Sequence, residues 1–291
     1  MKKKVLILGS TGMLGHQVVN YFLKFDDYDV IDIAFRSKLR EKTILLDVTD
    51  KSAFEKVLNE MSPDFIVNCI GVLIHGSSKV ANAIYLNAYL PHYLKKISKS
   101  IDAKIIHIST DCVFSGDKGL YIESDFKDAK GIYPQTKILG EIIDDSNITL
   151  RTSIIGPELK KNGEGLFHWF MSQQGNISGF TKSIWSGVTT IELAKFIKWA
   201  IDNRITGLYH VTNNSYISKY ELLKLFQKYI KKDINIKSVN GKSVDKSFID
   251  TRLLMNYKIP SYDQMISELI RLIANNKSLY SQYKGGVFGK A

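Results

Sequence analysis

The sequence has few cysteines and no long apolar run. Its 291 residues include only two cysteines, Cys69 and Cys112. Two cysteines cannot build a disulfide framework or a zinc cluster, and they fit a reducing compartment. The apolar run that follows the amino-terminal lysines, at 5–8, is too short for a signal peptide, and no stretch approaches the length of a membrane span. The sequence therefore predicts a cytoplasmic protein with no membrane partner, and it gives no basis for a bound metal.

Acidic residues are in deficit. The 40 lysines and arginines exceed the 29 acidic residues, so the formal net charge is +11. A basic surface can serve nucleic acid or a small anion with several phosphates. The basic residues form no dense tract beyond the short runs at 2–4, 95–96, 160–161 and 231–232. We therefore expect a small phosphorylated ligand and no nucleic-acid partner.

Short apolar runs alternate with amphipathic stretches through the first half of the chain. Such continuous apolar strands, separated by helices, are typical of a parallel sheet covered on both faces. They predict an α/β fold, a Rossmann-type doubly wound parallel sheet with a smaller mixed α/β lobe at the carboxyl end. The expected strands are 4–9, 28–35, 64–71, 103–110 and 148–156, and the expected helices are 13–25, 50–61, 83–100 and 133–145.

After residue 156 the pattern is looser, with no internal repeat. It predicts helices at 189–202, 218–230 and 261–276, a strand at 207–214, and a loose tail at 281–291. We expect a dinucleotide-binding domain over 1–155, to which segments around 184–215 return. The rest of 156–291 is then mainly a substrate-binding lobe.

The first strand–helix junction reads "ILGSTGMLGHQ" and contains three regularly spaced glycines. Glycines let a backbone approach a pyrophosphate, and the N-terminus of the following helix offers free N–H groups to the anion. The alternative is a tight turn that binds nothing. The position at this junction favours a dinucleotide loop, with contacts from Gly9, Thr11, Gly12, Met13, Leu14 and Gly15.

The end of the second strand bears on the choice of cofactor. An acid at that end would accept the ribose hydroxyls of NAD. Asp32 lies too early in the strand, and the end carries Arg36, which could hold a 2′-phosphate. This favours NADPH, with NADH as the alternative, although Arg36 would also suit a solvated loop. Asp47, after the third strand, could reach the adenine amino group or serve as a turn residue.

Polar side chains gather where the strand "KIIHIST" ends. Ligands of doubly wound sheets bind beyond the carboxyl ends of the strands, which is where Thr110 and Asp111 lie. Tyr133 and Lys137 are four residues apart in the next predicted helix, so they share one face. We therefore expect a hydroxyl, a phenol and an ammonium to converge beside the cofactor.

These motifs resemble those of the extended short-chain dehydrogenase/reductases. "GSTGMLG", "VNCIG", "STD" and "YPQTK" occur in that superfamily's order and spacing. Within it, "STDCVFSG", "YPQTKILGE", "LRTSIIG" and "GLYHV" resemble the dTDP-4-dehydrorhamnose reductase family most, mainly over the first 215 residues. The resemblance implies NAD(P)H and a nucleotide sugar with a 4-keto group, in the synthesis of cell-surface polysaccharide precursors.

The resemblance also assigns roles to residues. It implies that Thr110, Tyr133 and Lys137 are the catalytic triad. Tyr133 would be the general acid, with a pKa lowered by Lys137 and the nicotinamide, and Thr110 would polarise the carbonyl. Asn87 matches a helix asparagine of the superfamily, or else is a solvated or capping residue. Further expected cofactor contacts are Val48, Asn68 and Gly71, and expected substrate contacts are Thr110, Asp111, Tyr133, Trp185 and Arg252.

Two departures leave alternatives open. The loop at 71–83 lacks the acidic motif that is usual in the family, and "DTRLL" replaces a proline-containing arginine motif, so the nucleotide and the sugar stay open. Cys112 and His168 resemble the acid and base of the GDP-fucose synthase family, an epimerase-reductase. A third reading is a non-catalytic NADP-binding regulatory subunit. A homodimer also stays open.

Overall fold

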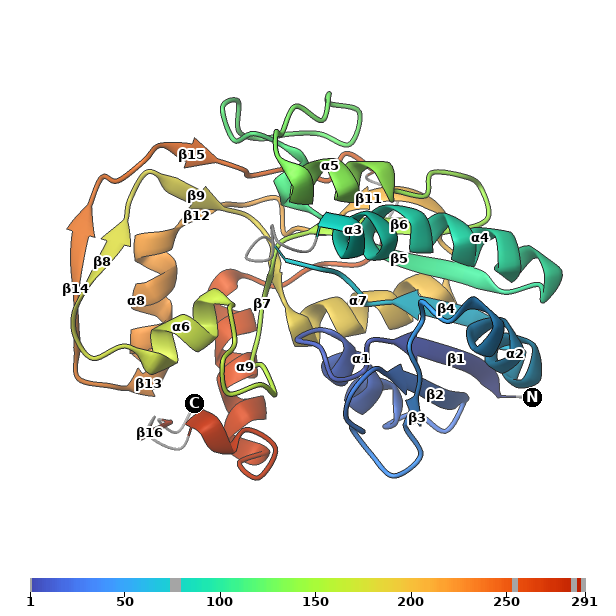
Figure 1. Ribbon diagram of the computed structural model, residues 1–291. Coiled ribbons are helices and arrows are strands. Elements are labelled where there is room, and N and C mark those ends of the chain that lie inside the picture. The colour runs from blue at the N-terminus through green and yellow to red at the C-terminus, as the bar shows by residue number, and fades with distance from the viewer. Residues whose placement is uncertain (1, 74–79, 253–255, 284–286, 289–291) are drawn as a thin grey trace. The chain divides into compact units, whose positions relative to one another are not determined.

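The computed structural model describes residues 2–73, 80–252, 256–283 and 287–288 (Figure 1). The chain forms two compact units, each assembled from three separate segments. The first unit contains 1–114, 126–151 and 194–209, and the second contains 115–125, 152–193 and 210–291. The expected roles of the two parts, cofactor binding and substrate binding, stay predictions.

A seven-stranded parallel sheet forms the centre of the first unit and confirms the predicted fold class. Its strand order is β11-β6-β5-β4-β1-β2-β3. The chain adds β2 and β3 on one side of β1 and then β4, β5, β6 and β11 on the other side. The strands are β1 (Lys3–Leu8), β2 (Tyr28–Ala34), β3 (Ile44–Leu45), β4 (Phe65–Asn68), β5 (Lys104–Thr110), β6 (Ile148–Thr152) and β11 (Gly207–His210).

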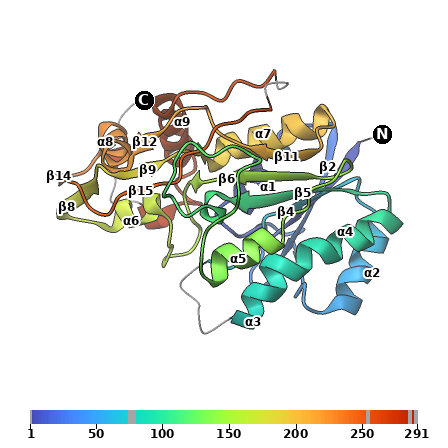
Figure 2. The ribbon, with the colours of Figure 1, turned by 90° about the horizontal axis from the view of Figure 1, so that it is seen from above.

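Helices cover both faces of this sheet. Figure 2 shows α4 and α5 on one face and α7 on the other. On the first face, α2 and α4 pack on alternate residues of the strands, with Leu6, Leu8 and Ile66 fully buried between them. The helices of this unit are α1 (Gly15–Phe22), α2 (Lys51–Met61), α3 (Val80–Ala83), the π-helix η2 (Ile84–Tyr89), α4 (Leu90–Ser100), the 3-10 turn η3 (Asp111–Val113), α5 (Ile132–Leu139) and α7 (Thr190–Asp202).

One edge of the sheet is closed by a side chain. Because β3 pairs only with Ile33 and Ala34, the first half of β2 pairs with β1 on one side and with no described strand on its outer side. Arg40 donates to the Val30 carbonyl there, and its Nε lies 2.6 Å from Asp32 Oδ1. Asp32 is fully buried within β2, which confirms that it lies before the strand's end. Its carboxylate balances Arg40 at a strand edge that would otherwise expose unpaired backbone groups.

The helix predicted at 83–100 is present as a continuous helical run of α3, η2 and α4, with a π-helical turn before α4 and Pro91 in the first turn of α4. The helix predicted at 133–145 is shorter than expected. The second helix ends at Leu139, because Gly140 approaches this π-helical turn closely. A Cβ on Gly140 would lie 1.8 Å from the Asn87 carbonyl oxygen. The prediction at 133–145 was therefore wrong about the end of that helix, through a tertiary contact that the periodicity does not show.

The second unit contains small sheets and three helices of at least seven residues within the part of the chain that the structure describes. Serine capping boxes begin α8 and α9. Pairing β8 with β14 in parallel was not predicted. The elements are β7 (Ile154–Ile155), α6 (Leu166–Ser172), β8 (Gly175–Phe180), β9 (Ser183–Trp185), β10 (Val188–Thr189), β12 (Ile217–Ser218), α8 (Lys219–Tyr229), β13 (Ile230–Lys231), β14 (Ile234–Val239), β15 (Val244–Asp245), α9 (Tyr262–Asn275), the 3-10 turn η4 (Ser281–Tyr283) and β16 (Val287–Phe288).

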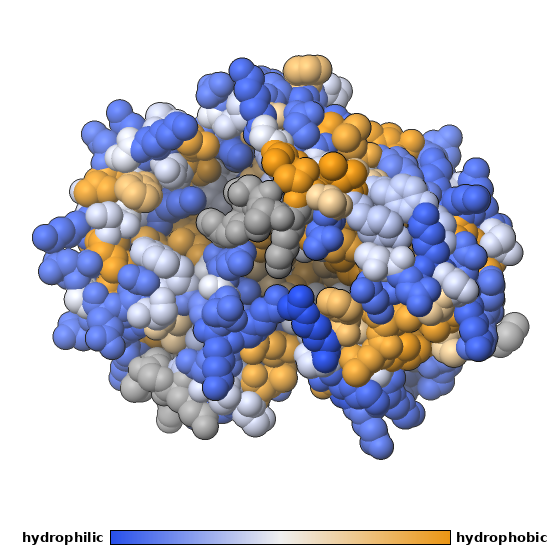
Figure 3. Space-filling model, in the orientation of Figure 1, coloured by the Kyte–Doolittle hydropathy of each residue, from blue (hydrophilic) through white to orange (hydrophobic). Residues whose placement is uncertain are grey.

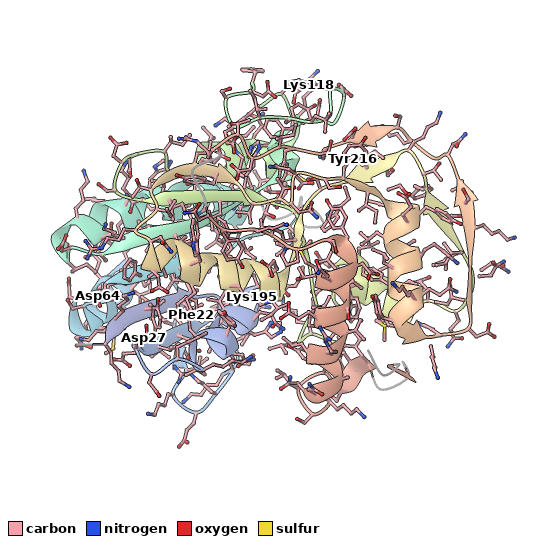
Figure 4. The ribbon with its side chains drawn as sticks, turned by 180° about the vertical axis from the view of Figure 1, so that it is seen from behind. Phe22, Asp27, Asp64, Lys118, Lys195 and Tyr216 are labelled. Atoms are coloured by element: carbon pink, nitrogen blue, oxygen red, sulfur yellow. The ribbon has the colours of Figure 1, made fainter. Side chains whose placement is uncertain are left out.

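Of the predicted loose tail at 281–291, residues 281–283 form η4 and 287–288 form β16, and the others lie outside the described part of the chain. Residues 287–288 pair with Ile230 and Lys231, and Tyr283 is buried. The segment 115–125 also belongs to this unit, and Figure 4 shows Lys118 on the loop that it forms. Within this loop Lys118 pairs with Asp125.

The face seen in Figure 3 is mostly hydrophilic, with apolar atoms in small scattered patches. None of the helices over the described residues has the length and apolar character needed to cross a membrane.

Candidate functional site

The glycine loop leaves β1 with its backbone turned sharply. Gly9 has a φ of +78°, which favours glycine. A Cβ on Gly15 would lie 2.1 Å from the Gly9 carbonyl oxygen, so the first turn of α1 closes directly onto the loop. Within the described chain, the N–H groups of Thr11, Met13 and Leu14 donate to no backbone carbonyl. Free N–H groups at a helix N-terminus fit a pyrophosphate.

Two buried asparagines hold the loop that follows β4. The sheet register places Asn68 beside Leu8 of β1 and His107 of β5. Asn68 Oδ1 accepts the Ile70 N–H, at 3.1 Å. Asn87 Oδ1 accepts the Val72 N–H, at 2.9 Å, and its amide donates to the Val72 carbonyl. Gly71 therefore lies in a segment that side chains hold from both ends.

Asn87 also connects this loop to α5. Its amide nitrogen lies 3.2 Å from Thr136 Oγ1, and its side chain is completely buried. Asn87 is thus neither solvated nor a helix cap. It lies in the π-helical turn, and such turns often occur at functional sites.

The end of β5 brings Thr110, Asp111 and Tyr133 together. Thr110 Oγ1 donates to Asp111 Oδ1, at 3.0 Å, and accepts the Cys112 N–H, at 3.1 Å. The Tyr133 phenol, in the first turn of α5, lies close enough to the Thr110 side chain for that hydroxyl to act on its pKa. Cys112 is also close enough to act on the Tyr133 charge. The predicted convergence of a hydroxyl and a phenol at this strand end is therefore present in the geometry.

Lys137 lies one turn after Tyr133 and points inward. It is buried, and its Nζ donates to the Ile108 carbonyl, at 2.7 Å. Burial lowers the pKa of the ammonium to about 8, while the charge of Glu141 acts in the opposite direction. Lys137 is therefore largely protonated at neutral pH but close to its titration.

The expected effect on Tyr133 is wrong in direction for the protein's own groups. Burial raises the pKa of the Tyr133 phenol, and the nearby Cys112 and Asp111 raise it further. The neighbouring Thr110 hydroxyl acts in the opposite direction, but by less than burial. Desolvation exceeds the favourable contact because the phenolate would be a buried charge.

The predicted adenosine-side residues lie in different settings. Arg36 is exposed, and its guanidinium stacks over the Phe35 ring at 5.2 Å. Asp47 is exposed and accepts both the N–H and the hydroxyl of Thr49, as a turn residue does. Val48 is buried in the core between α2 and β2. One oxygen of Asp47 is therefore already engaged in its own turn.

The remaining predicted substrate residues belong to the second unit. Trp185 is buried on β9, and its indole N–H donates to Ser153 Oγ, at 2.9 Å. Arg252 is exposed, and its backbone N–H donates to Asp250 Oδ1, at 2.9 Å. Trp185 thus uses its one polar group inside its own unit, whereas the Arg252 side chain reaches the surface.

Both ring nitrogens of His168 are engaged within the second unit. Gly163 N–H lies 3.2 Å from Nε2, and Nδ1 lies 2.9 Å from the Tyr283 hydroxyl. Since a backbone N–H can only donate, Nε2 accepts, and a neutral ring then carries its proton on Nδ1. Gly163 also packs directly against the ring. The contacts of His168 therefore stabilise the loop that precedes α6.

A buried ion pair was missed at the sequence level. Glu141, just after α5, binds Arg151 of β6 through both oxygens, at 2.6 and 2.8 Å. Glu141 also accepts from Ser109 Oγ, at 2.8 Å. An arginine inside the apolar strand "ITLRT" was the available signal, because a buried charge requires a partner.

Three features define the class of protein: the parallel sheet, the glycine turn after β1, and Tyr133 and Lys137 of α5 beside the end of β5. The chain is an extended short-chain dehydrogenase/reductase built on an NAD(P)-binding fold. Residues 2–247 match the family model described as the RmlD substrate binding domain. The chain belongs to this family, and the resemblance drawn from the motifs is confirmed at that level.

Three known proteins show the range of its relatives. The spore coat polysaccharide biosynthesis protein SpsK of Bacillus subtilis is 29% identical over 227 residues, which cover 75% of this chain and 76% of that protein. The methionine adenosyltransferase 2 subunit beta of Rattus norvegicus is 27% identical over 237 residues, covering 76% and 70%. A dTDP-4-dehydrorhamnose reductase from Bacillus anthracis, solved in complex with NADP, has a TM-score of 0.80 at 24% identity, over 94% of this chain and 100% of that one.

Proposed function

We propose that the protein uses NADPH to reduce the 4-keto group of a nucleotide-linked 6-deoxy sugar. The observation that carries this proposal is that the Thr110 hydroxyl and the Tyr133 phenol lie together at the end of β5, one turn from the buried Lys137. A phenol and a hydroxyl that lie side by side can both form hydrogen bonds with the carbonyl oxygen of one substrate. The family match and the basic net charge support the same class of ligand.

NADPH, when bound, supplies the hydride. The N–H groups of the 9–15 loop would hold its pyrophosphate, and Lys137 would bind the ribose next to the nicotinamide. Tyr133 would give its proton to the developing alkoxide, and a phenol with a raised pKa stays protonated until that moment. Thr110 would donate to the same oxygen. Lys137 would stabilise the resulting phenolate.

The substrate is the less constrained part of the proposal. Trp185 and Arg252 of the second unit, with Asp111, are the expected sugar-nucleotide contacts. The name of the Bacillus subtilis relative supports a place in polysaccharide synthesis. A panel of dTDP-, UDP- and GDP-linked 4-keto-6-deoxy sugars tests this, followed by the loss of NADPH absorbance in the near ultraviolet. We expect oxidation of NADPH with at least one of them. The cytoplasmic location and a homodimer stay predictions.

The preference for NADPH rests on Arg36. Its guanidinium is exposed and already oriented over Phe35, so no partner has to be broken when a 2′-phosphate binds. Replacing Arg36 by Ala should weaken NADPH binding about tenfold or more and leave NADH binding unchanged, because one ion pair to a phosphate is lost. Titrating both cofactors by fluorescence measures this. Equal losses for the two cofactors would remove the basis of the preference.

A non-catalytic regulatory subunit is the second candidate. It is favoured by the relative that is named as a subunit of a methionine adenosyltransferase. Tight NADPH binding without oxidation by any sugar in the panel would select this reading.

The epimerase-reductase alternative has one observation on each side. Cys112 lies close to Tyr133, as that chemistry needs, but His168 has both ring nitrogens engaged in its own loop. Reaction in heavy water separates the two. Deuterium at the carbons beside C4 would indicate epimerisation, and its absence would indicate simple reduction.

A further inference from the structure

The buried carboxylate of Glu141 is the hub of a polar network beside the triad. Its side chain is 1% exposed and that of Arg151 is 2% exposed. Besides the two bonds from Arg151 and the one from Ser109, it accepts from Lys127 Nζ, at 3.0 Å. The Arg151 guanidinium also lies over the Phe114 ring, at 5.5 Å. One carboxylate thus accepts hydrogen bonds from three separate segments of the first unit.

Two residues of this network, Ser109 and Glu141, lie close in sequence to members of the triad. Ser109 immediately precedes Thr110 on β5. Glu141 follows the short helix that carries Tyr133 and Lys137, one residue beyond the Gly140 stop. The reaction proposed above uses neither Glu141 nor Arg151. Burying such a pair costs desolvation that a hydrophobic pair would avoid, so its role is better sought in positioning than in stability.

The charges around Lys137 give the network a second consequence. From β5, His107 faces Lys137, and burial keeps this histidine neutral by lowering its pKa well below the usual value. From the chain after α5, Glu141 faces Lys137 as an anion. Arg151 and Lys127 lie against Glu141, and Asn87 from η2 contacts Thr136 without a charge. Glu141 is therefore the acidic group that acts on the Lys137 ammonium.

We propose that Glu141 positions the catalytic set, by fixing Ser109 next to Thr110 and by supplying the anion that balances the Lys137 ammonium. Arg151 holds that carboxylate in place and moderates its charge. The inference rests on the proposed function of the same site, because it assigns Lys137 the task of binding the cofactor. It adds a residue that touches neither the substrate nor the cofactor.

The test uses two charge changes of opposite sign on the full chain. Glu141→Gln removes the anion, so Lys137 should lose its proton at a lower pH. Arg151→Met leaves the anion with less compensation, so Lys137 should keep its proton to a higher pH. The first readout is the pH at which NADPH binding weakens, measured by fluorescence titration. The second is the pH at which turnover falls on the alkaline side of its pH profile, called the basic limb below. We expect shifts of roughly one pH unit, downward for Glu141→Gln and upward for Arg151→Met.

Controls separate positioning from stability. Glu158→Gln alters another buried glutamate, which accepts the N–H groups of Glu164 and Gly165, and it should leave the basic limb in place. If a single variant does not fold, the double variant Glu141→Gln, Arg151→Met removes both buried charges and should fold. Its limb should still lie below that of the wild type.

The outcomes are distinct. Opposite shifts in the two single variants, or a lowered limb in the double variant, support the proposal. Shifts of the same sign, or a double variant with the wild-type limb, overturn it. The NADPH-binding measurement needs no sugar. If the protein binds NADPH but none of the tested sugars leads to NADPH oxidation, only the proposed function is contradicted. A wild type that binds no NADPH would instead overturn the common basis of both.

Discussion

At the residue scale, Tyr133 carries a phenol whose pKa is raised by burial and which lies beside the Thr110 hydroxyl. Replacing Tyr133 by Phe removes one hydroxyl that lies beside Thr110. Turnover should fall by roughly two to four powers of ten, the usual range for a general acid. Unfolding free energy should change by about 1 kcal/mol or less, and NADPH binding should persist. Steady-state kinetics with denaturant unfolding measures all three, and near-normal turnover would refute the triad.

Thr110 has a structural task beside its expected catalytic one. It caps η3 by accepting the Cys112 N–H and donates to Asp111. Thr110→Val should therefore cost about 1 kcal/mol of stability, the usual worth of such a cap. Turnover should fall less than for Tyr133→Phe, because one oxyanion donor is lost while the acid remains. A valine variant with unchanged stability and turnover would contradict both tasks.

At the scale of elements, the stop of α5 depends on an absent side chain. Gly140→Ala would place a methyl group against the Asn87 carbonyl, so α5 and η2 would have to separate. We expect a loss of about 1–3 kcal/mol, as for other overpacked sites. Leu139→Ala, one residue earlier and 64% exposed, is the control and should change stability by less than about 0.5 kcal/mol. Chemical denaturation compares them, and equal effects would argue against the close approach.

The end of α7 is tied to the starts of β1 and β2 by Asp202. Burial alone would raise its pKa, but hydrogen bonds from Lys198, Lys3 and Tyr28 lower it to about 2. Because the folded pKa lies below the unfolded one, this stabilisation is present above about pH 4 and is lost as the pH falls towards 2. Asp202→Asn should cost about 1 kcal/mol at neutral pH, since the carboxylate is partly exposed. The difference from the wild type should vanish near pH 2, and a constant difference would exclude the tie.

Elements and site differ in how far the sequence predicts them. Apolar periodicity predicted the parallel strands. The glycine spacing and the Tyr133–Lys137 pair predicted which strand ends and helices carry the candidate site residues. The end of α5 and the β8–β14 pair escaped, because each depends on a contact between distant parts of the chain. The Tyr133 pKa escaped for a related reason. Desolvation depends on everything that surrounds a group, whereas a motif names only its partners in sequence.

At the scale of the whole molecule, the chain alternates between its two units. The predicted boundary near residue 155 falls after β6, and the segment predicted to return around 184–215 contains 194–209 of the first unit, which holds most of α7 and most of β11. A fragment of residues 1–155 would lack strand β11 and helix α7, whose last residue, Asp202, contacts the starts of β1 and β2. We expect it to show no cooperative thermal transition, measured by circular dichroism. A sharp transition like that of the full chain would show that the first 155 residues fold alone.

The alternation has a consequence during synthesis. When β6 leaves the ribosome, the strand that will pair with it, β11, lies more than fifty residues further along, beyond a segment of the other unit. At typical elongation rates this interval is roughly 3–10 s. Throughout it the nascent chain presents the free edge of β6, an unpaired apolar strand of the kind that joins foreign strands. The strand order of this sheet therefore leaves one strand edge of the newly made chain unpaired during one definable interval of its synthesis.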